Sequence, residues 1–221
     1  MNDLQEYFNQ NQENLIYKWL HYFDIYERHF ARFRNTDVHV LEIGVWHGGS
    51  LQMWKSYFGT KCKIFGVDIN PQCQNLEEDH VRIFIGDQRD KHFLEHLKRD
   101  IPRLDILIDD GGHEMEQQIN TFEVLYPHIT ANGIYLCEDL HTSYWKEYGG
   151  GYREPGTFVE FSKSLIDALH GWHSRNPLEL TVSEFTRSTY GLHFYDSVLV
   201  VEKCPIQPPH ACQRGNPALP A

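Results

Sequence analysis

The sequence has little cysteine, and none of it forms a recognisable cross-linking or zinc motif. Five cysteines are spread over 221 residues, and no C-x-x-C pair occurs. An odd number of cysteines at wide spacing argues against a disulfide framework and against a zinc knuckle. This pattern predicts reduced thiols and a cytoplasmic protein, with Cys62 and Cys137 as small buried residues of strands.

Long apolar runs and clusters of basic residues are also missing. No apolar stretch approaches the roughly 18 residues of a membrane helix, and the N-terminus is polar, so we expect neither a membrane span nor a secretory leader. The formal net charge is −11 without any Lys/Arg run, which argues against nucleic acid or an anionic membrane as a general partner. The length fits one α/β domain, and we find no internal repeat.

The stretch from Val38 to Leu51 is the most organised part of the chain. Its first half is apolar and β-branched, which predicts a buried parallel strand over 38–45, and glycines then lead into a helix from about residue 50. The spacing Glu42-x-Gly44-x-x-x-Gly48-Gly49 differs from the dinucleotide-binding G-x-G-x-x-G. A glycine turn before a helix N-terminus nevertheless suits a nucleoside ligand, and an acid before it suits an ammonium group such as that of S-adenosylmethionine.

Two further predicted strands end in polar residues. The run 63–68 ends in Asp68, and the run 81–86 is followed by Asp87 and Gln88. An acid at the position of Asp68 can accept hydrogen bonds from ribose hydroxyls, and the pair after it can contact the base-ribose region. The plainer alternative for each is capping of the next helix.

The strongest motif is acidic and follows the fourth and fifth predicted strands. The run 104–108 leads into Asp109-Asp110-Gly111-Gly112-His113, and 134–137 leads into Glu138-Asp139. Adjacent carboxylates repel one another unless a cation compensates them, and oxygen ligands favour Mg²⁺. We therefore predict a metal site at these strand ends with His113 as a nearby general base, against the alternative of solvated surface acids and a solvated helix start.

The rest of the chain frames this centre. Residues 3–35 are expected to be helical, with aromatic residues packed on the sheet. Tyr144, Trp145 and Tyr148 lie in a glycine-rich loop that suits stacking on an acceptor. The runs 178–185 and 192–201 are expected to pair as antiparallel strands.

In combination, these motifs resemble the class I S-adenosylmethionine-dependent methyltransferases. The closest likeness is to the metal-dependent sugar O-methyltransferases of macrolide biosynthesis and their cephalosporin-hydroxylase and rhamnosyl O-methyltransferase relatives. This resemblance implies a Rossmann-like, mostly parallel seven-stranded α/β sheet with an antiparallel last strand and helices on both faces. It also implies an N-terminal helical segment over 1–37, a methyltransferase domain over 38–203 and an extended or disordered tail over 204–221.

The resemblance also implies roles for individual residues. The methionine end of S-adenosylmethionine would lie against Glu42, Gly44 and Ser50, and its nucleoside against Asp68, Asp87 and Gln88, with Asp109 on the same cofactor side. Mg²⁺ would be bound by Asp110, Glu138 and Asp139, and His113 would be the base. Gly112 replaces a serine that is frequent in the family, and we expect this chain to lack the large extra N-terminal region of the macrolide enzymes.

The resulting functional hypothesis is Mg²⁺-dependent O-methylation of a sugar hydroxyl on a small, glycosylated acceptor, by a protein that can form a homo-oligomer. Two alternatives stay open from the residues alone. One is a catechol-type O-methyltransferase, because a phenolic diol also presents adjacent oxygens. The other is a non-catalytic partner protein that binds S-adenosylmethionine.

Overall fold

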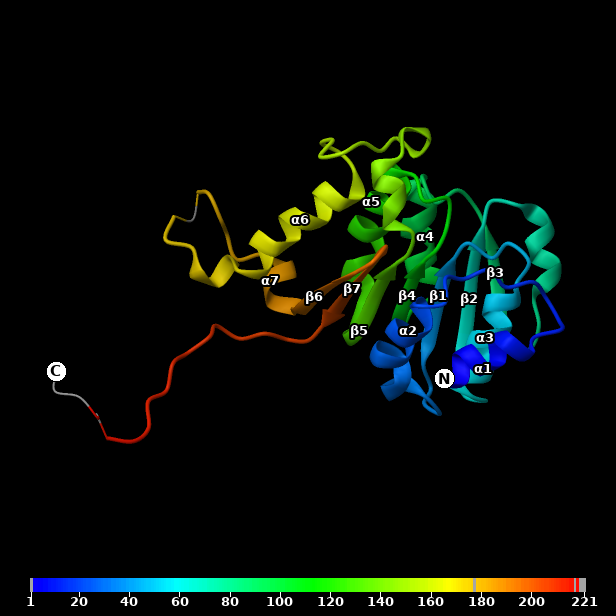
Figure 1. Ribbon diagram of the computed structural model, residues 1–221, viewed down its shortest axis with the longest axis horizontal. Coiled ribbons are helices and arrows are strands. Elements are labelled where there is room, and N and C mark those ends of the chain that lie inside the picture. The colour runs from blue at the N-terminus through cyan, green and yellow to red at the C-terminus, as the bar shows by residue number, and fades with distance from the viewer. Residues whose placement is uncertain (1, 177, 217, 219–221) are drawn as a thin grey trace.

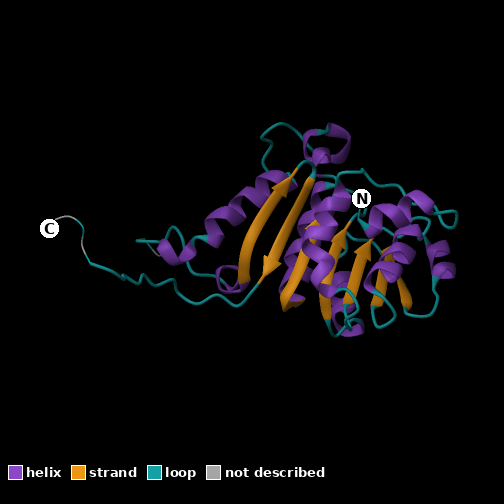
Figure 2. Ribbon diagram, turned by 60° about the horizontal axis from the view of Figure 1, so that its bottom comes forward, coloured by secondary structure: helices purple, strands orange, loops and turns teal. Residues whose placement is uncertain are grey.

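The computed structural model describes residues 2–176, 178–216 and 218. Its centre is a seven-stranded sheet in the order β3-β2-β1-β4-β5-β7-β6. The strands are β1 (His39–Ile43), β2 (Lys63–Asp68), β3 (Val81–Ile85), β4 (Leu104–Asp109), β5 (Ile129–Cys137), β6 (Thr189–Tyr195) and β7 (Val198–Lys203). β1 to β5 are parallel, and β7 runs antiparallel to both β5 and β6 (Figure 2). This is the Rossmann-like fold of class I methyltransferases, as the sequence predicted.

Helices cover both faces of the sheet (Figure 1). The α-helices are α1 (Asp3–Gln10), α2 (Tyr22–Phe30), α3 (Gly49–Phe58), α4 (Lys91–Asp100), α5 (Met115–Leu125), α6 (Phe158–Leu169) and α7 (Glu184–Ser188). Short 3₁₀ turns are η1 (Ala31–Phe33), η2 (Pro71–Leu76), η3 (Tyr126–His128), η4 (Leu140–Tyr144), η5 (Lys146–Tyr148) and η6 (Gly171–His173).

Alternation along the strands creates two cores, one on each face of the sheet. In β1, Val40 belongs to the core formed with α1, α2 and α3, whereas its neighbour Leu41 belongs to the core formed with α4, α5 and α6. Successive strand residues point to opposite faces, so a fully apolar strand fills both cores at once. This explains why the central strands read as unbroken apolar runs.

The N-terminal region is not one helical segment, which corrects the prediction for residues 3–35. Two helices, α1 and α2, are separated by an irregular stretch over residues 11–21, which we call the strap. The side chain of Asn11 donates to the carbonyl of Asn14 at 2.8 Å, and such local bonds compete with helix formation. Along the strap, Ile16 and Lys18 are buried whereas Leu15 and Tyr17 are exposed, which is the alternation of an extended chain.

The predicted pairing of 178–185 with 192–201 is wrong, because the antiparallel hairpin is formed by β6 and β7. Residues 178–185 form no strand, because Ser183 and Thr186 make a capping box that starts α7. The run 192–201 spans two strands, since Ser197 adopts a positive φ of 62° and turns the chain between β6 and β7. Apolar residues on both sides of this tight turn concealed it in the sequence.

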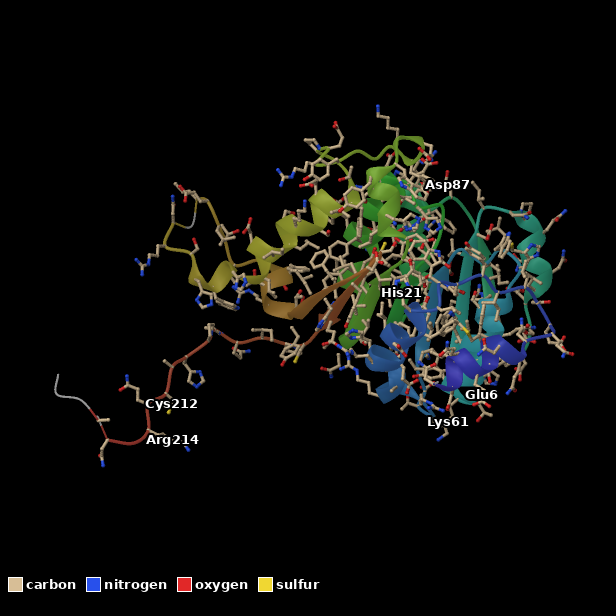
Figure 3. The ribbon with its side chains drawn as sticks, in the orientation of Figure 1. Glu6, His21, Lys61, Asp87, Cys212 and Arg214 are labelled. Carbon is tan, nitrogen blue, oxygen red and sulfur yellow. The ribbon has the colours of Figure 1, made fainter. Side chains whose placement is uncertain are left out.

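Beyond β7, the described part of the tail contains neither helix nor strand and leaves the body of the protein (Figure 1). Cys212 and Arg214 lie on it, far from the sheet (Figure 3). The prediction of an extended tail also covers residues 217 and 219–221, which lie outside the described residues. No helix in the described ranges combines the length and apolar character needed to cross a membrane.

Candidate functional site

A cavity of about 500 Å³ opens where the chain leaves the carboxyl ends of β1, β2, β4 and β5. The strand order reverses between β1 and β4, and ligands of open α/β sheets bind at such a switch point. The strap closes one side of the cavity with residues 15–19, and Tyr148 of η5 forms part of the wall. Asp87 lies at this edge of the sheet (Figure 3).

The glycine-rich turn brings β1 against the end of β4. Gly44 has φ +98°, and a Cβ placed on it would lie 2.0 Å from the carbonyl oxygen of Asp110. Only glycine allows this approach, which sets the start of the turn directly beside the acidic motif. Asp68 fixes the turn from β2, because its Oδ2 accepts from the backbone N–H groups of Val45 and Trp46 at 3.0 and 2.9 Å.

Five of the predicted cofactor-binding residues reach the cavity wall, and two lie behind it. The wall contains Gly44, Ser50, Asp68, Asp87 and Gln88. Glu42 and Asp109 are both buried and contact other protein groups instead.

Glu42 acts on the wall through Ser50. Ser50 Oγ donates to its Oε2 at 2.6 Å, and Trp54 Nε1 donates to its Oε1 at 3.1 Å. Burial raises the pKa of Glu42, and the Lys18 ammonium opposes that rise. The side chain therefore orients Ser50 at the N-terminal turn of α3.

Asp109 supports Gln88 in the same manner. Gln88 Nε2 donates to Asp109 Oδ1 at 2.6 Å and to Thr121 Oγ1 at 3.0 Å, while its Oε1 accepts from the N–H of Gly112. Burial raises the pKa of Asp109 to about 7. Gln88 thus holds the glycine pair of the acidic motif in place.

Asp110, His113 and Asp139 converge on the cavity, and each offers a ligand atom within 4.8 Å of the other two. His113 Nε2 lies 3.4 Å from Asp139 Oδ2 and 3.9 Å from Asp110 Oδ1. Tyr22 donates its hydroxyl to the other oxygen of Asp139 at 2.7 Å. His113 Nδ1 is buried without a hydrogen-bond partner among the described residues. A similar group in those residues, His29 with His193 and Glu202, joins α2 to the β6–β7 hairpin.

Glu138 lines the same cavity but is not part of this group of three, and its carboxylate is bonded to Lys18 and Tyr26. Both of its oxygens accept from Lys18 Nζ at 2.9 Å, and its Oε1 also accepts from the Tyr26 hydroxyl at 2.6 Å. Burial and the neighbouring Asp110 raise the pKa of Glu138. Its role as a metal ligand stays a prediction.

Lys18 belongs to the site, although the sequence did not predict a role for it. Its Nζ also donates to Asp110 Oδ2 at 2.5 Å and lies 3.8 Å from Glu42 Oε1. The sequence does offer one sign of this role, a single lysine in an otherwise apolar and aromatic stretch. Because the sequence predicts a helix there, it does not indicate which residues the lysine contacts. Only the fold brings residue 18 beside residues 110 and 138.

The aromatic loop is only partly a cavity wall. Tyr148 lines the cavity, whereas Tyr144 and Trp145 are largely exposed and do not line it. His141 of η4 stacks on Trp19 of the strap with ring centroids 4.7 Å apart, so the loop and the strap meet beside the cavity. The predicted substrate contacts of Tyr144 and Trp145 stay predictions.

Known proteins resemble this chain in the region of the cavity. Residues 41–140 match a family described as a methyltransferase domain, and these residues run from β1 through the acidic motifs to the start of η4. This part of the chain is similar to that methyltransferase domain.

Curated relatives of this chain include O-methyltransferases of Micromonospora and Streptomyces species. The mycinamicin VI 2''-O-methyltransferase of Micromonospora griseorubida is 39% identical over 197 residues, covering 84% of this chain and 49% of that protein. The demethylmacrocin O-methyltransferase of Streptomyces fradiae is 38% identical over 200 residues, covering 84% and 50%. A 2-methoxy-rhamnosyl-tetracenomycin-C 3'-O-methyltransferase of Streptomyces olivaceus is 37% identical over 195 residues, covering 84% and 50%. This chain spans about half the length of these relatives.

A solved structure is similar over nearly the whole chain. The MycE methyltransferase of the mycinamycin biosynthetic pathway, in complex with Mg and SAH, is 36% identical with a TM-score of 0.80, covering 92% of this chain and 54% of that one. A complex of MycE that also contains mycinamycin VI gives 37% identity and a TM-score of 0.78, with coverage of 92% and 53%.

Proposed function

We propose that this chain is an O-methyltransferase that transfers the methyl group of S-adenosylmethionine to a sugar hydroxyl of a glycosylated natural product, with Mg²⁺ as cofactor. The observation that carries the proposal is the convergence of Asp110, Asp139 and His113 on a cavity beside the glycine-rich turn. The relatives support the acceptor class, because one is named for a rhamnosyl group and another was solved with mycinamycin VI.

The donor would occupy the side of the cavity formed by the glycine-rich turn. Gly44 and Ser50 would contact its methionine part, and Asp68 and Asp87 its nucleoside part. Asp68 keeps capacity for ribose hydroxyls, since each carboxylate oxygen accepts more than one hydrogen bond. Glu42, Asp109 and Gln88 would hold these contacts in place through the bonds described above.

The carboxylates of Asp110 and Asp139 fit a hard divalent cation, because Mg²⁺ prefers oxygen ligands and binds proteins through one or two carboxylates. Glu138 is assigned as a further ligand. When bound, the ion would lower the pKa of an acceptor hydroxyl and orient it. Two adjacent sugar oxygens suit such a site.

His113 would supply the base. Its Nε2 faces the carboxylates of Asp110 and Asp139 and would take the proton of the acceptor hydroxyl. The hydroxyl oxygen would form its bond to the methyl carbon as the carbon–sulfur bond breaks, which leaves S-adenosylhomocysteine. The strap, with Trp19, and Tyr148 of η5 would exclude water by closing the cavity.

The proposal is tested by methyl transfer from labelled S-adenosylmethionine to a panel of rhamnosides, macrolide glycosides and catechols. We expect transfer to a glycoside, and His113→Ala should lower turnover by ~10²–10⁴ while binding of S-adenosylhomocysteine is retained. EDTA should abolish transfer, and Mg²⁺ should restore it.

Other results of these measurements would contradict the acceptor class, the role of His113 or the catalytic activity itself. Transfer to catechol alone would overturn the acceptor class, and full activity of His113→Ala would remove this residue from the mechanism. Donor binding with no transfer to any acceptor would favour the non-catalytic binding protein. The cytoplasmic location and a homo-oligomeric state are further predictions for the same preparation.

A further inference from the structure

The ammonium of Lys18 uses all of its hydrogen-bond donors beside the group formed by Asp110, His113 and Asp139. An ammonium group has three donors, and all three are used on Glu138 Oε1, Glu138 Oε2 and Asp110 Oδ2. Its side chain is 2% exposed, whereas those of Asp110, His113 and Asp139 are 20–23% exposed. The ammonium of Lys18 is therefore shielded from solvent more completely than the three groups that it neighbours, although the residue also lines the cavity.

This position divides the two oxygens of Asp110 between two tasks. Oδ2 accepts from Lys18, and Oδ1 faces His113 Nε2 at 3.9 Å, in the group that also contains Asp139. A carboxylate bonded through one oxygen cannot rotate freely about its last bond. Lys18 thus fixes the direction in which Asp110 presents its other oxygen to the cavity.

The strap is itself anchored on the glycine-rich turn, which keeps Lys18 in place. A Cβ on Gly49 would lie 2.4 Å from the carbonyl oxygen of Asn14 and 2.5 Å from that of Leu15. One residue after Lys18, Trp19 stacks on His141. Contacts of the residues before and after Lys18 therefore hold this part of the strap in place.

Charge accounting is consistent with Lys18 staying in the loaded site. Four carboxylates (Glu42, Asp110, Glu138 and Asp139) surround this region, and Lys18 compensates one of them. One divalent cation would compensate two of the remaining three negative charges.

We propose that Lys18 is a positioning residue of the divalent-cation site, which aligns Asp110 and Glu138 for the ion through its three hydrogen bonds. This inference rests on the metal dependence of the proposed function. The competing interpretation is that Lys18 occupies the place of the ion and must leave before the ion binds. The two interpretations predict opposite effects of removing Lys18 on the affinity for the cation. Loss of a positioning residue would weaken cation binding, whereas removal of a competing positive charge would strengthen it.

The test is calorimetric titration of the full chain with Mn²⁺, without donor or acceptor. Lys18→Met should bind Mn²⁺ about 10–100-fold more weakly than the unmodified protein, the usual cost of losing a group that orients metal ligands. The matched control is Lys203→Met, which removes another buried lysine with three hydrogen bonds far from the cavity and should leave the affinity unchanged. Circular dichroism establishes that each variant is folded.

Lys18→Arg keeps the positive charge but changes the geometry of its hydrogen bonds. This variant therefore distinguishes the two interpretations if Lys18→Met does not fold. Weaker binding by Lys18→Arg supports positioning, and unchanged binding contradicts it. Equal or tighter binding by a folded Lys18→Met also overturns the proposal. If the unmodified protein binds no Mn²⁺, both this proposal and the metal dependence fail, whereas methyl transfer in EDTA reports separately on the rest of the proposed function.

Discussion

Two buried lysines lie in different regions of this protein, and their environments have opposite effects on their charge. Lys18, in the N-terminal strap, donates to carboxylate oxygens, and Lys203, at the end of β7, donates to the carbonyl oxygens of Tyr126, Pro127 and Ile129. Burial alone would lower the pKa of Lys18, but Asp110, Glu138 and Glu42 outweigh it and hold that pKa well above its usual value. Burial lowers the pKa of Lys203 to about 8.

The comparison teaches that the charge of the acceptors, and not the number of hydrogen bonds, decides how a buried ammonium is tolerated. Carbonyl dipoles satisfy the donors of Lys203 but do not offset the loss of hydration of its charge. Carboxylates offset that loss for Lys18, and the lysine in turn offsets theirs. Lys18 therefore belongs to an ionic centre, whereas Lys203 joins the last strand to η3 and the start of β5.

The largest expected difference between the two lysines is in stability. Lys18→Met leaves buried Glu138 and Glu42 without a cation, so it should lower the free energy of unfolding by about 3–5 kcal/mol. Lys203→Met loses hydrogen bonds to carbonyls but also removes a poorly hydrated charge, so its loss should be about 1–3 kcal/mol. Urea unfolding at neutral pH without divalent ions measures both. A larger loss for Lys203→Met would reverse the comparison.

A smaller effect, on pH dependence, sharpens the same contrast. The folded state of the protein favours the neutral amine of Lys203, so between pH 8 and the ordinary lysine pKa of 10.5 the unfolded chain binds more protons. Stability contributed by this group should rise with pH across that window. We expect the difference in unfolding free energy between the unmodified protein and Lys203→Met to shift in favour of the unmodified protein from pH 8 to pH 10. A difference that is constant with pH would show that Lys203 is not destabilised by burial.

Local motifs predicted the scaffold and the convergence of Asp110, His113 and Asp139. The reason is that short stretches of sequence are enough to indicate strand ends and glycine turns. Asp110 and Asp139 follow directly from the rule that parallel strands end at one edge of the sheet. Lys18 could not be found in this way, since its partners are 92 and 120 residues away and its extended backbone depends on packing against Gly49. A local pattern also cannot show how deeply a side chain is buried. For this reason the sequence predicts that Glu42 and Asp109 contact the cofactor, although the structure places both side chains behind the cavity wall.

The central claim is that Asp110 and Asp139 bind a divalent cation beside the donor cavity while Lys18 stays on Glu138. The most direct measurement is a crystal structure with Mn²⁺ and S-adenosylhomocysteine, in which anomalous scattering locates the ion. The account predicts one strong peak about 2–2.5 Å from oxygens of Asp110 and Asp139, with Glu138 as the further ligand and Lys18 Nζ still bonded to its carboxylate. The absence of a peak there, or a peak in the place of a displaced Lys18 ammonium, would contradict it.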